Sequence, residues 1–180
     1  MSTLREYLAQ KRRAWLSKQD TIATADVITP TAKVSAEGRS GVRRIRIRDH
    51  QVLSDSGPDY AGYDLGPSSP ELQLGVLGSC VTHIFLIQAA AADLVLDSVE
   101  VEVTATIDPK AGTPGFEDVP PSPQDISYTV QIGSPASDEE IDALFAAVER
   151  ACPILNLLTN PQTITGTVVR VPAQSEESAR

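Results

Sequence analysis

The chain has 180 residues, enough to bury one hydrophobic core, and its 41% hydrophobic and 22% charged residues are typical of a globular domain. Its net charge of −9 and its 4% aromatic content argue against nucleic-acid binding, because phosphates attract cations and single strands need stacking surfaces. The charge is uneven, since residues 1–50 hold 11 Lys and Arg against 5 Asp and Glu, and the remainder holds 4 against 19. Either the basic N-terminal residues 1–50 pack or dimerise against an acidic surface, or the basic and acidic regions are two solvated faces.

The first predicted element is a polar amphipathic helix over residues 2–19. The apolar residues that recur in it at roughly helical spacing are Leu4, Leu8, Trp15 and Leu16. Charges interrupt this segment where a secretory signal needs an unbroken apolar run, so we expect a cytoplasmic protein. Residues 1–25 are predicted to be a helical extension of one domain that spans residues 26–172.

A β-hairpin is predicted next, with strands at residues 32–38 and 41–49 that the turn EGRSG joins. The second strand alternates apolar and basic residues, which is typical of a half-buried strand. Residues 54–68 are rich in turn formers and are expected to form a loop.

A long helix follows this loop. Ser68 or Ser69 can cap its N-terminus, and Pro70 suits its first position. Residues 72–86 are apolar on nearly every side, which predicts a buried central helix. The polar residues that interrupt its most apolar stretch are His83, Gln88 and Asp93. Because of these interruptions, we expect the segment to fall short of a membrane span.

The C-terminal half is predicted from alternation, capping residues and turn formers. The expected order is a strand over 96–108, a proline-rich loop over 108–123, a strand over 126–132, a helix opened by a Ser137–Glu140 capping box, and a strand over 163–171. Pro153 should end that helix. Strands grouped apart from helices predict an α+β fold. Residues 173–180 are predicted to form a disordered tail.

The two cysteines, Cys80 within the central helix and Cys152 at the end of the last helix, are the best functional lead. One thiol can attack a substrate, and the other can resolve the sulfenic acid as a disulfide. Alternatively, both fill the core, since free cysteine is among the most buried residue types. His83, one turn after Cys80, is expected to be a hydrogen-bonded core histidine. No metal site is expected, because two Cys and two scattered His lack ligand spacing.

Three segments, in this order, resemble the OsmC/Ohr family, the osmotically inducible protein C and organic hydroperoxide resistance proteins. They are the turn EGRSG, the segment GPSSPELQLGVLGSC that leads into the first cysteine, and ERACPILNLL with the second cysteine before a proline. The resemblance covers residues 30–171. It implies antiparallel sheets around a long buried central helix, in an intertwined homodimer with active sites at the subunit interface. The N-terminal helix is an addition to that fold.

The resemblance also implies thiol-dependent reduction of organic hydroperoxides and the residues that perform it. Cys80 falls on the peroxidatic cysteine and Cys152 on the resolving cysteine. Arg39 falls on the arginine that activates the thiol, with Arg43 as its first alternative, and Glu71 on the glutamate that orients the arginine. A guanidinium favours a thiolate, and a carboxylate holds a guanidinium in a fixed pose. No bound cofactor is implied, and the reductant is an external dithiol of lipoyl type or a small dithiol.

Glu71 precedes Cys80 by nine positions, which places the two on opposite faces of one straight helix. Either the helix begins after Glu71, or Glu71 reaches the site of a different subunit. A third reading is that Glu71 merely compensates the helix dipole.

Three functions therefore compete. The first is an antioxidant peroxidase, an oxidoreductase that protects against oxidative stress. The second is a non-enzymatic protein of the same fold that binds a small apolar ligand at the dimer interface. The third is an assembly module that docks through the N-terminal helix. None of them involves nucleic acid or a membrane.

Overall fold

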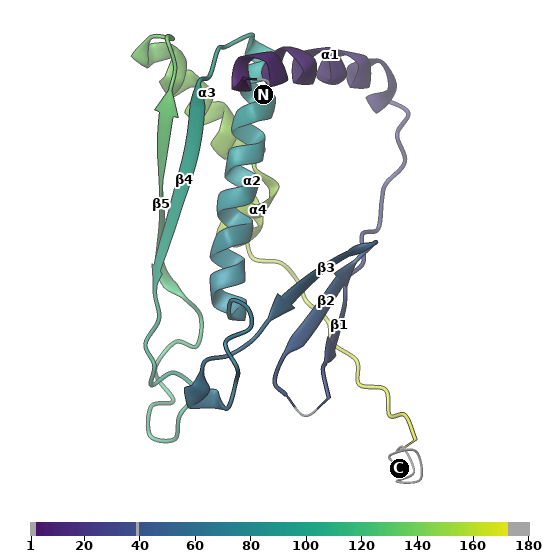
Figure 1. Ribbon diagram of the computed structural model, residues 1–180, viewed down its shortest axis with the longest axis vertical. Coiled ribbons are helices and arrows are strands. Elements are labelled where there is room, and N and C mark those ends of the chain that lie inside the picture. The colour runs from purple at the N-terminus through teal and green to yellow at the C-terminus, as the bar shows by residue number, and fades with distance from the viewer. Residues whose placement is uncertain (1–2, 39, 173–180) are drawn as a thin grey trace.

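The computed structural model of the chain describes residues 3–38 and 40–172, so that Arg39 and the predicted tail, residues 173–180, lie outside the described residues. The helices and strands are arranged around one long helix (Figure 1). In chain order they are α1 (Leu4–Ile22), β1 (Lys33–Ala36), β2 (Arg43–Ile47), β3 (His50–Ser54), the 3-10 helix η1 (Pro58–Tyr60), α2 (Ser69–Ala92), β4 (Ser98–Thr106), β5 (Gln124–Gly133), α3 (Asp138–Ala151) and α4 (Pro153–Thr159). The predicted α+β class is confirmed.

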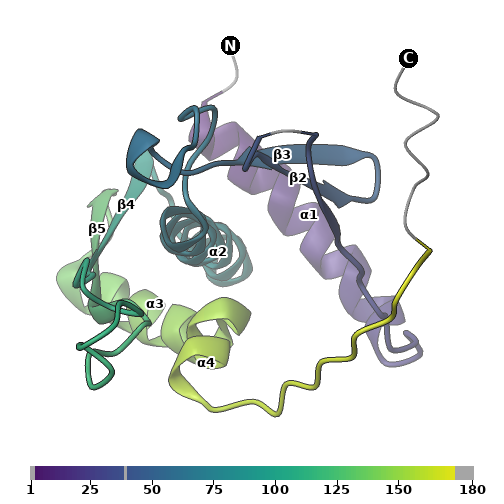
Figure 2. The same cartoon turned by 90° about the horizontal axis from the view of Figure 1, so that it is seen from below.

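Helix α2 is the axis of the fold and begins where the sequence predicts. Ser68 is its N-cap: the Ser68 hydroxyl accepts a hydrogen bond from the backbone N–H of Glu71, and the Glu71 carboxylate accepts one from the backbone N–H of Ser68. Pro70 lies in the first turn, where a missing N–H costs no helical hydrogen bond. Four elements, α1, β4, α3 and α4, pack around α2, which is seen nearly end-on in Figure 2.

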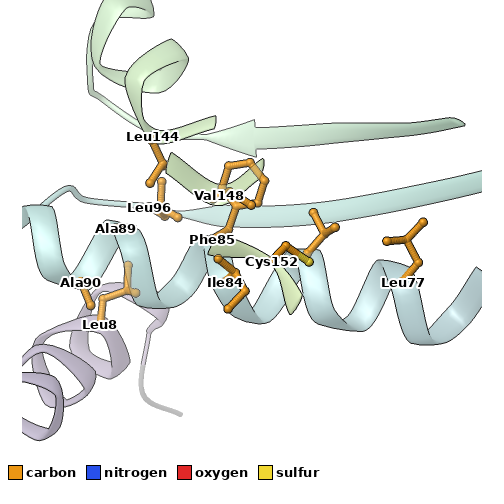
Figure 3. Packing of buried hydrophobic residues seen from close by; sticks show 11 residues of the cluster. Leu8, Leu77, Ile84, Phe85, Ala89, Ala90, Leu96, Leu144, Val148 and Cys152 are labelled. Carbon is orange, nitrogen blue, oxygen red and sulfur yellow. The ribbon is translucent and has the colours of Figure 1, made fainter. Parts of the chain in front are cut away.

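One cluster of buried side chains joins these elements (Figure 3). Phe85 and Val148 are fully buried in it, and the Phe85 ring lies 6.2 Å from the ring of Phe145. Burying such a side chain contributes about 1.5–3 kcal/mol. The buried members of the cluster are Leu8, Leu77, Val81, Ile84, Phe85, Ala89, Ala90, Leu96, Leu144, Val148 and Cys152.

By length and composition alone, α2 could also cross a membrane, because it has 24 residues and a mean hydropathy of 1.7 in its most apolar window. The expectation that this segment falls short of a span is therefore wrong. Asp93 lies just after the helix as its C-cap, and the interruptions inside the helix, His83 and Gln88, are not formal charges at neutral pH. The core helix of a folded domain meets the same criterion, and four elements pack against α2.

Strands β4 and β5 form an antiparallel pair alongside α2. Val101 pairs with Val130, and Val103 pairs with Tyr128. These side chains are half-buried against the core cluster, whereas the intervening residues of β4 are exposed. The predicted alternation of β4 is thus confirmed as one face turned to the core.

A second sheet, in the order β1-β2-β3, lies to one side of α2 (Figure 1). The predicted hairpin is confirmed, with Val34 opposite Ile45. Strand β3 is not predicted by the sequence. It pairs with β2 after a tight turn at Arg48, whose φ of 54° is uncommon for a residue with a side chain. Val34 remains 56% exposed, so the apolar face of this sheet is uncovered in the single chain.

The strand predicted over residues 163–171 is wrong for the single chain, since these residues form neither helix nor strand. Ile164 and Val168 are each 91% exposed. A strand persists only where a neighbour pairs with its N–H and C=O groups, and no described strand pairs with this segment. Helix α4, which precedes the segment, is not predicted either, because its seven residues are too few to show a helical period.

Helix α1 lies across the C-terminal end of α2, and the predicted helix is confirmed. Leu8 is buried in the core cluster. The Arg12 guanidinium donates hydrogen bonds to the carbonyls of Ala90 (2.9 Å) and Ala91 (3.0 Å). These are among the last four carbonyls of α2, which lack partners within the helix, and a cation is favourable at this end of a helix dipole.

Replacing Arg12 by methionine should lower the free energy of unfolding by about 1–2 kcal/mol, because the change removes two charge-assisted hydrogen bonds but keeps most of the apolar stem. Urea denaturation followed by circular dichroism measures this loss. Arg13→Met is the matched control, since Arg13 is exposed on the same helix. Equal losses in the two variants would contradict docking through Arg12.

Candidate active site

The two thiols singled out in the sequence lie side by side. The Sγ atom of Cys152 is 3.4 Å from the Sγ atom of Cys80, although the residues are 72 positions apart. Cys80 is half-buried on α2, whereas Cys152 is fully buried among the core side chains (Figure 3). Both thiols are free, and a disulfide would bring the sulfurs to about 2.05 Å. A small approach of the two sulfur atoms would therefore allow a bond.

Cys152 reaches this place because the chain bends there. It is both the C-cap of α3 and the N-cap of α4, with an extended backbone at φ −73° and ψ 111°. Its N–H still donates to the Val148 carbonyl at 2.8 Å. Pro153 disfavours the helical conformation at the residue before it, as the sequence predicts. The bend turns the chain from α3 into α4 at the thiol itself.

The surroundings of Cys80 favour the neutral thiol. Burial raises the pKa of Cys80 above its ordinary value, and the neighbouring Cys152 raises it further. The backbone N–H of Ile154, at the start of α4, acts in the opposite direction and lowers the pKa of Cys80. The described residues of the single chain thus leave the Cys80 thiol less acidic than a free cysteine.

Tyr128 and Glu149 form a second pair near the thiols that the sequence does not single out. The Tyr128 hydroxyl donates to the Glu149 carboxylate at 2.9 Å, and the Tyr128 ring lies 6.1 Å from that of Phe145. Burial raises the pKa of Tyr128, and the hydrogen bond to Glu149 raises it further. Tyr128 therefore stays a neutral hydrogen-bond donor at physiological pH.

The predicted arginine is not part of the described geometry, because Arg39 lies outside the described residues. Its alternative, Arg43, is held within its own sheet. The Arg43 guanidinium donates to the Ser54 hydroxyl at 3.0 Å, the Asp55 carbonyl at 2.8 Å and the Gly41 carbonyl at 2.9 Å. These contacts tie Arg43 to β3 and the loop after it, and give it a structural role in the single chain.

Glu71 lies inside α2, which excludes the reading in which the helix begins after it. Nine residues of helix place Glu71 and Cys80 about 13 Å apart along the axis. The Glu71 carboxylate accepts hydrogen bonds from the backbone N–H and the hydroxyl of Ser68, both at 2.7 Å, and these lower the pKa of Glu71. Within one chain, Glu71 therefore caps a helix and does not meet the thiols.

His83 does not occupy the expected core position, because its side chain is exposed. Partial burial of the ring lowers the pKa of His83, and the positive charge of Lys11 lowers it further. Among residues 3–38 and 40–172, no group of three or more His, Cys, Asp or Glu is placed to hold a metal ion.

The sequence profile of OsmC-like proteins matches residues 62–166, which is more than half of the chain and includes Glu71 and both cysteines. The chain therefore belongs to the OsmC-like protein family. The match begins after α1 and the β1-β2-β3 sheet, so it does not include Arg39. A search of curated proteins found no match to the sequence.

Solved structures show the same fold. An OsmC-like protein from Mycoplasma pneumoniae gives a TM-score of 0.64 at 18% identity, over 74% of this chain and 89% of that chain. An OsmC-like protein of unknown function from Vibrio cholerae gives a TM-score of 0.59 at 13% identity, over 72% of this chain and 93% of that chain. An organic hydroperoxide resistance protein, OsmC, from Legionella pneumophila gives a TM-score of 0.53 at 15% identity, over 74% of this chain and 91% of that chain. The identities are low, so these likenesses establish the fold.

Proposed function

We propose that this protein is a thiol-dependent peroxidase that reduces organic hydroperoxides to alcohols. The observation that carries the proposal is the 3.4 Å separation between the sulfur atoms of Cys80 and Cys152. The family and the name of the Legionella relative support the substrate class. The apolar surroundings of Cys80 on α2 favour a hydrophobic peroxide over hydrogen peroxide.

The chemistry proceeds in two steps. The Cys80 thiolate attacks the terminal peroxide oxygen, the O–O bond breaks, and the departing alkoxide takes a proton to leave as the alcohol. This leaves a sulfenic acid on Cys80. The Cys152 sulfur then attacks the Cys80 sulfur, a disulfide forms, and the hydroxyl leaves as water. Cys80 is assigned to the first step because it is the more accessible thiol, and Cys152 is fully buried.

The working unit in this proposal is an intertwined homodimer. Apolar side chains in the segment between α1 and β1 and in the segment after α4 are open to water in the single subunit: Val27 is 98% exposed, and Val168 is 91% exposed. The β1-β2-β3 sheet likewise has an uncovered apolar face. A second copy of the chain would bury these groups and give residues 163–171 a strand to pair with.

The dimer would also complete the site. Cys80 needs a cation to become a thiolate at neutral pH, and Arg39 is the residue that the family resemblance assigns to that task. Glu71 lies too far from Cys80 to orient an arginine there from its own helix. In the proposed dimer, Glu71 and Arg39 therefore act at a site shared between subunits.

An external dithiol, of lipoyl type or a small dithiol, would reopen the disulfide by thiol–disulfide exchange. A reducing cytoplasm suits this cycle, because it keeps both thiols free between turnovers. The protein itself would need no bound cofactor.

The raised pKa of Cys80 favours a second candidate function, the non-enzymatic binding of a small apolar ligand. A groove of about 350 Å³ between α2 and β4 offers a place for it, and its lining residues are Glu71, Leu74, Gly75, Gly78, Val101 and Val103. The assembly function has less support, because α1 already buries Leu8 against its own α2.

One equivalent of cumene hydroperoxide should convert the reduced protein to an intramolecular Cys80–Cys152 disulfide. The physical reason is that the two sulfurs already lie 3.4 Å apart. Peptide mapping under non-reducing conditions identifies the bond. A ligand-binding protein would keep two free thiols after the same treatment, and disulfides only between subunits would also contradict the proposed chemistry.

A further inference from the structure

We propose that Asn156 is a positioning residue that holds the bend between α3 and α4 and so keeps the Cys152 thiol beside Cys80. The kinetic consequence of this proposal rests on the proposed peroxidase function. Its geometric consequence does not, and can be measured without any peroxide.

The bend takes two hydrogen-bond donors away from the end of α3. If the helix continued, the N–H groups of residues 153 and 154 would donate to the carbonyls of Glu149 and Arg150. Pro153 has no N–H, and Ile154 belongs to the new helix α4. The carbonyls of Glu149 and Arg150 therefore need other donors if the bend is to be held in one shape.

The side chain of Asn156 supplies these donors. Its Nδ2 atom donates to the carbonyl of Glu149 at 3.1 Å, to that of Arg150 at 3.4 Å and to that of Cys152 at 2.8 Å. The backbone N–H of Asn156 also donates to the Cys152 carbonyl, at 3.0 Å. One amide thus ties the last turn of α3 to the first turn of α4, with the resolving cysteine between them.

The two thiols are held in place by different parts of the structure. Cys80 is carried by α2, which α1 and β4 contact independently of the bend. Cys152 is carried by the bend itself. Loosening the bend should therefore bring the two sulfurs together less often and slow disulfide formation much more than it slows the attack of Cys80 on a peroxide.

The direct test is the equilibrium of the Cys80–Cys152 dithiol with a glutathione redox buffer, which reports the effective concentration of one thiol at the other. In Asn156→Ala this effective concentration should fall roughly tenfold, a change that corresponds to about 1.4 kcal/mol. The side chain in Asn156→Asp has the same shape but cannot donate a hydrogen bond, so the effective concentration should fall at least as far in this variant. Asn156→Ser keeps one donor and should lie between wild type and Asn156→Ala.

Asn160→Ala is the matched control. The Asn160 amide also donates to main-chain and side-chain oxygens, those of Asn156 and Thr159, but at the far end of α4. The control should keep the wild-type effective concentration. Circular dichroism and thermal unfolding of each variant show that it is folded. Equal values for folded Asn156→Ala, Asn156→Asp and wild type would overturn the positioning role.

The kinetic test follows a single turnover with cumene hydroperoxide and a sulfenic-acid probe. Asn156→Ala should convert the Cys80 sulfenic acid to the disulfide roughly tenfold more slowly, whereas the formation of the sulfenic acid should slow much less. Equal slowing of both steps would contradict the proposal. If the wild-type protein reduces no peroxide but Asn156→Ala still lowers the effective concentration, the peroxidase proposal fails and the positioning role stands.

Discussion

Cys80→Ser should abolish hydroperoxide consumption, with a fall of roughly three orders of magnitude or more. A hydroxyl has a far higher pKa than a thiol, so it provides almost no anion to attack the O–O bond at neutral pH. Cys152→Ser, in contrast, should keep the rate of the first turnover and stop there, with a sulfenic acid trapped on Cys80. The difference is expected because, in the proposed cycle, attack and resolution are separate steps performed by separate thiols.

Stopped-flow kinetics with an alkyl hydroperoxide and a sulfenic-acid probe distinguish the two variants. The half-buried Cys80 should be labelled in Cys152→Ser, and no label should enter Cys80→Ser. Excess dithiol should restore turnover in Cys152→Ser, because an external thiol can resolve the sulfenic acid in place of Cys152. Equal loss of the first-turnover rate in both variants would refute this division of labour.

Arg39→Met should raise the pKa of the Cys80 thiol in the proposed dimer and slow peroxide reduction together. An opposite charge within about 4–6 Å shifts a pKa by roughly 1–3 units, so the thiolate fraction at neutral pH should fall about 10-fold to 1000-fold. The sign follows from the charge: the lost cation disfavours the thiolate, and the midpoint of the pH–rate profile moves upward. The rate should fall further than the thiolate fraction, since in the proposed mechanism the guanidinium would also stabilise the leaving alkoxide.

Thiolate absorbance against pH, measured beside the kinetics, reports both quantities. Arg46→Met is the matched control, because Arg46 is an exposed arginine of β2. Burial and Cys152 already raise the pKa of Cys80 in the single chain, so dilution of the wild type to monomers should move the midpoint upward as well. An unchanged pKa in Arg39→Met would remove Arg39 from the mechanism.

Local sequence rules located most of the helices and strands. The capping boxes at Ser68 and Ser137 open α2 and α3 where they are expected, because a short side chain and a glutamate three residues later satisfy the first free N–H groups of a helix. The alternation of β4 predicted a strand with one covered face. These features depend on residues close together in the chain, so they can be read without the fold.

The predictions that fail concern segments whose strand pairing depends on residues elsewhere in the chain. Strand β3 exists because β2 lies beside it, and its own sequence carries little alternation. The segment 163–171 has the composition of a strand but no strand pairs with it in the described chain, so it remains irregular. In both cases the ladder of hydrogen bonds comes from elsewhere, and local composition cannot supply it.

For the candidate site, too, some features follow from the sequence and others only from the tertiary structure. Sequence by itself determined that two cysteines lie on helical segments, that Pro153 ends the second helix at Cys152, and that the family resemblance assigns both to redox chemistry. Only the tertiary structure decided that their sulfurs are 3.4 Å apart and that Glu71 caps α2 at a distance from them. The reason is physical: packing of α3 and α4 against α2 buries a shared apolar core, and that burial, which no local pattern encodes, sets where the two thiols meet.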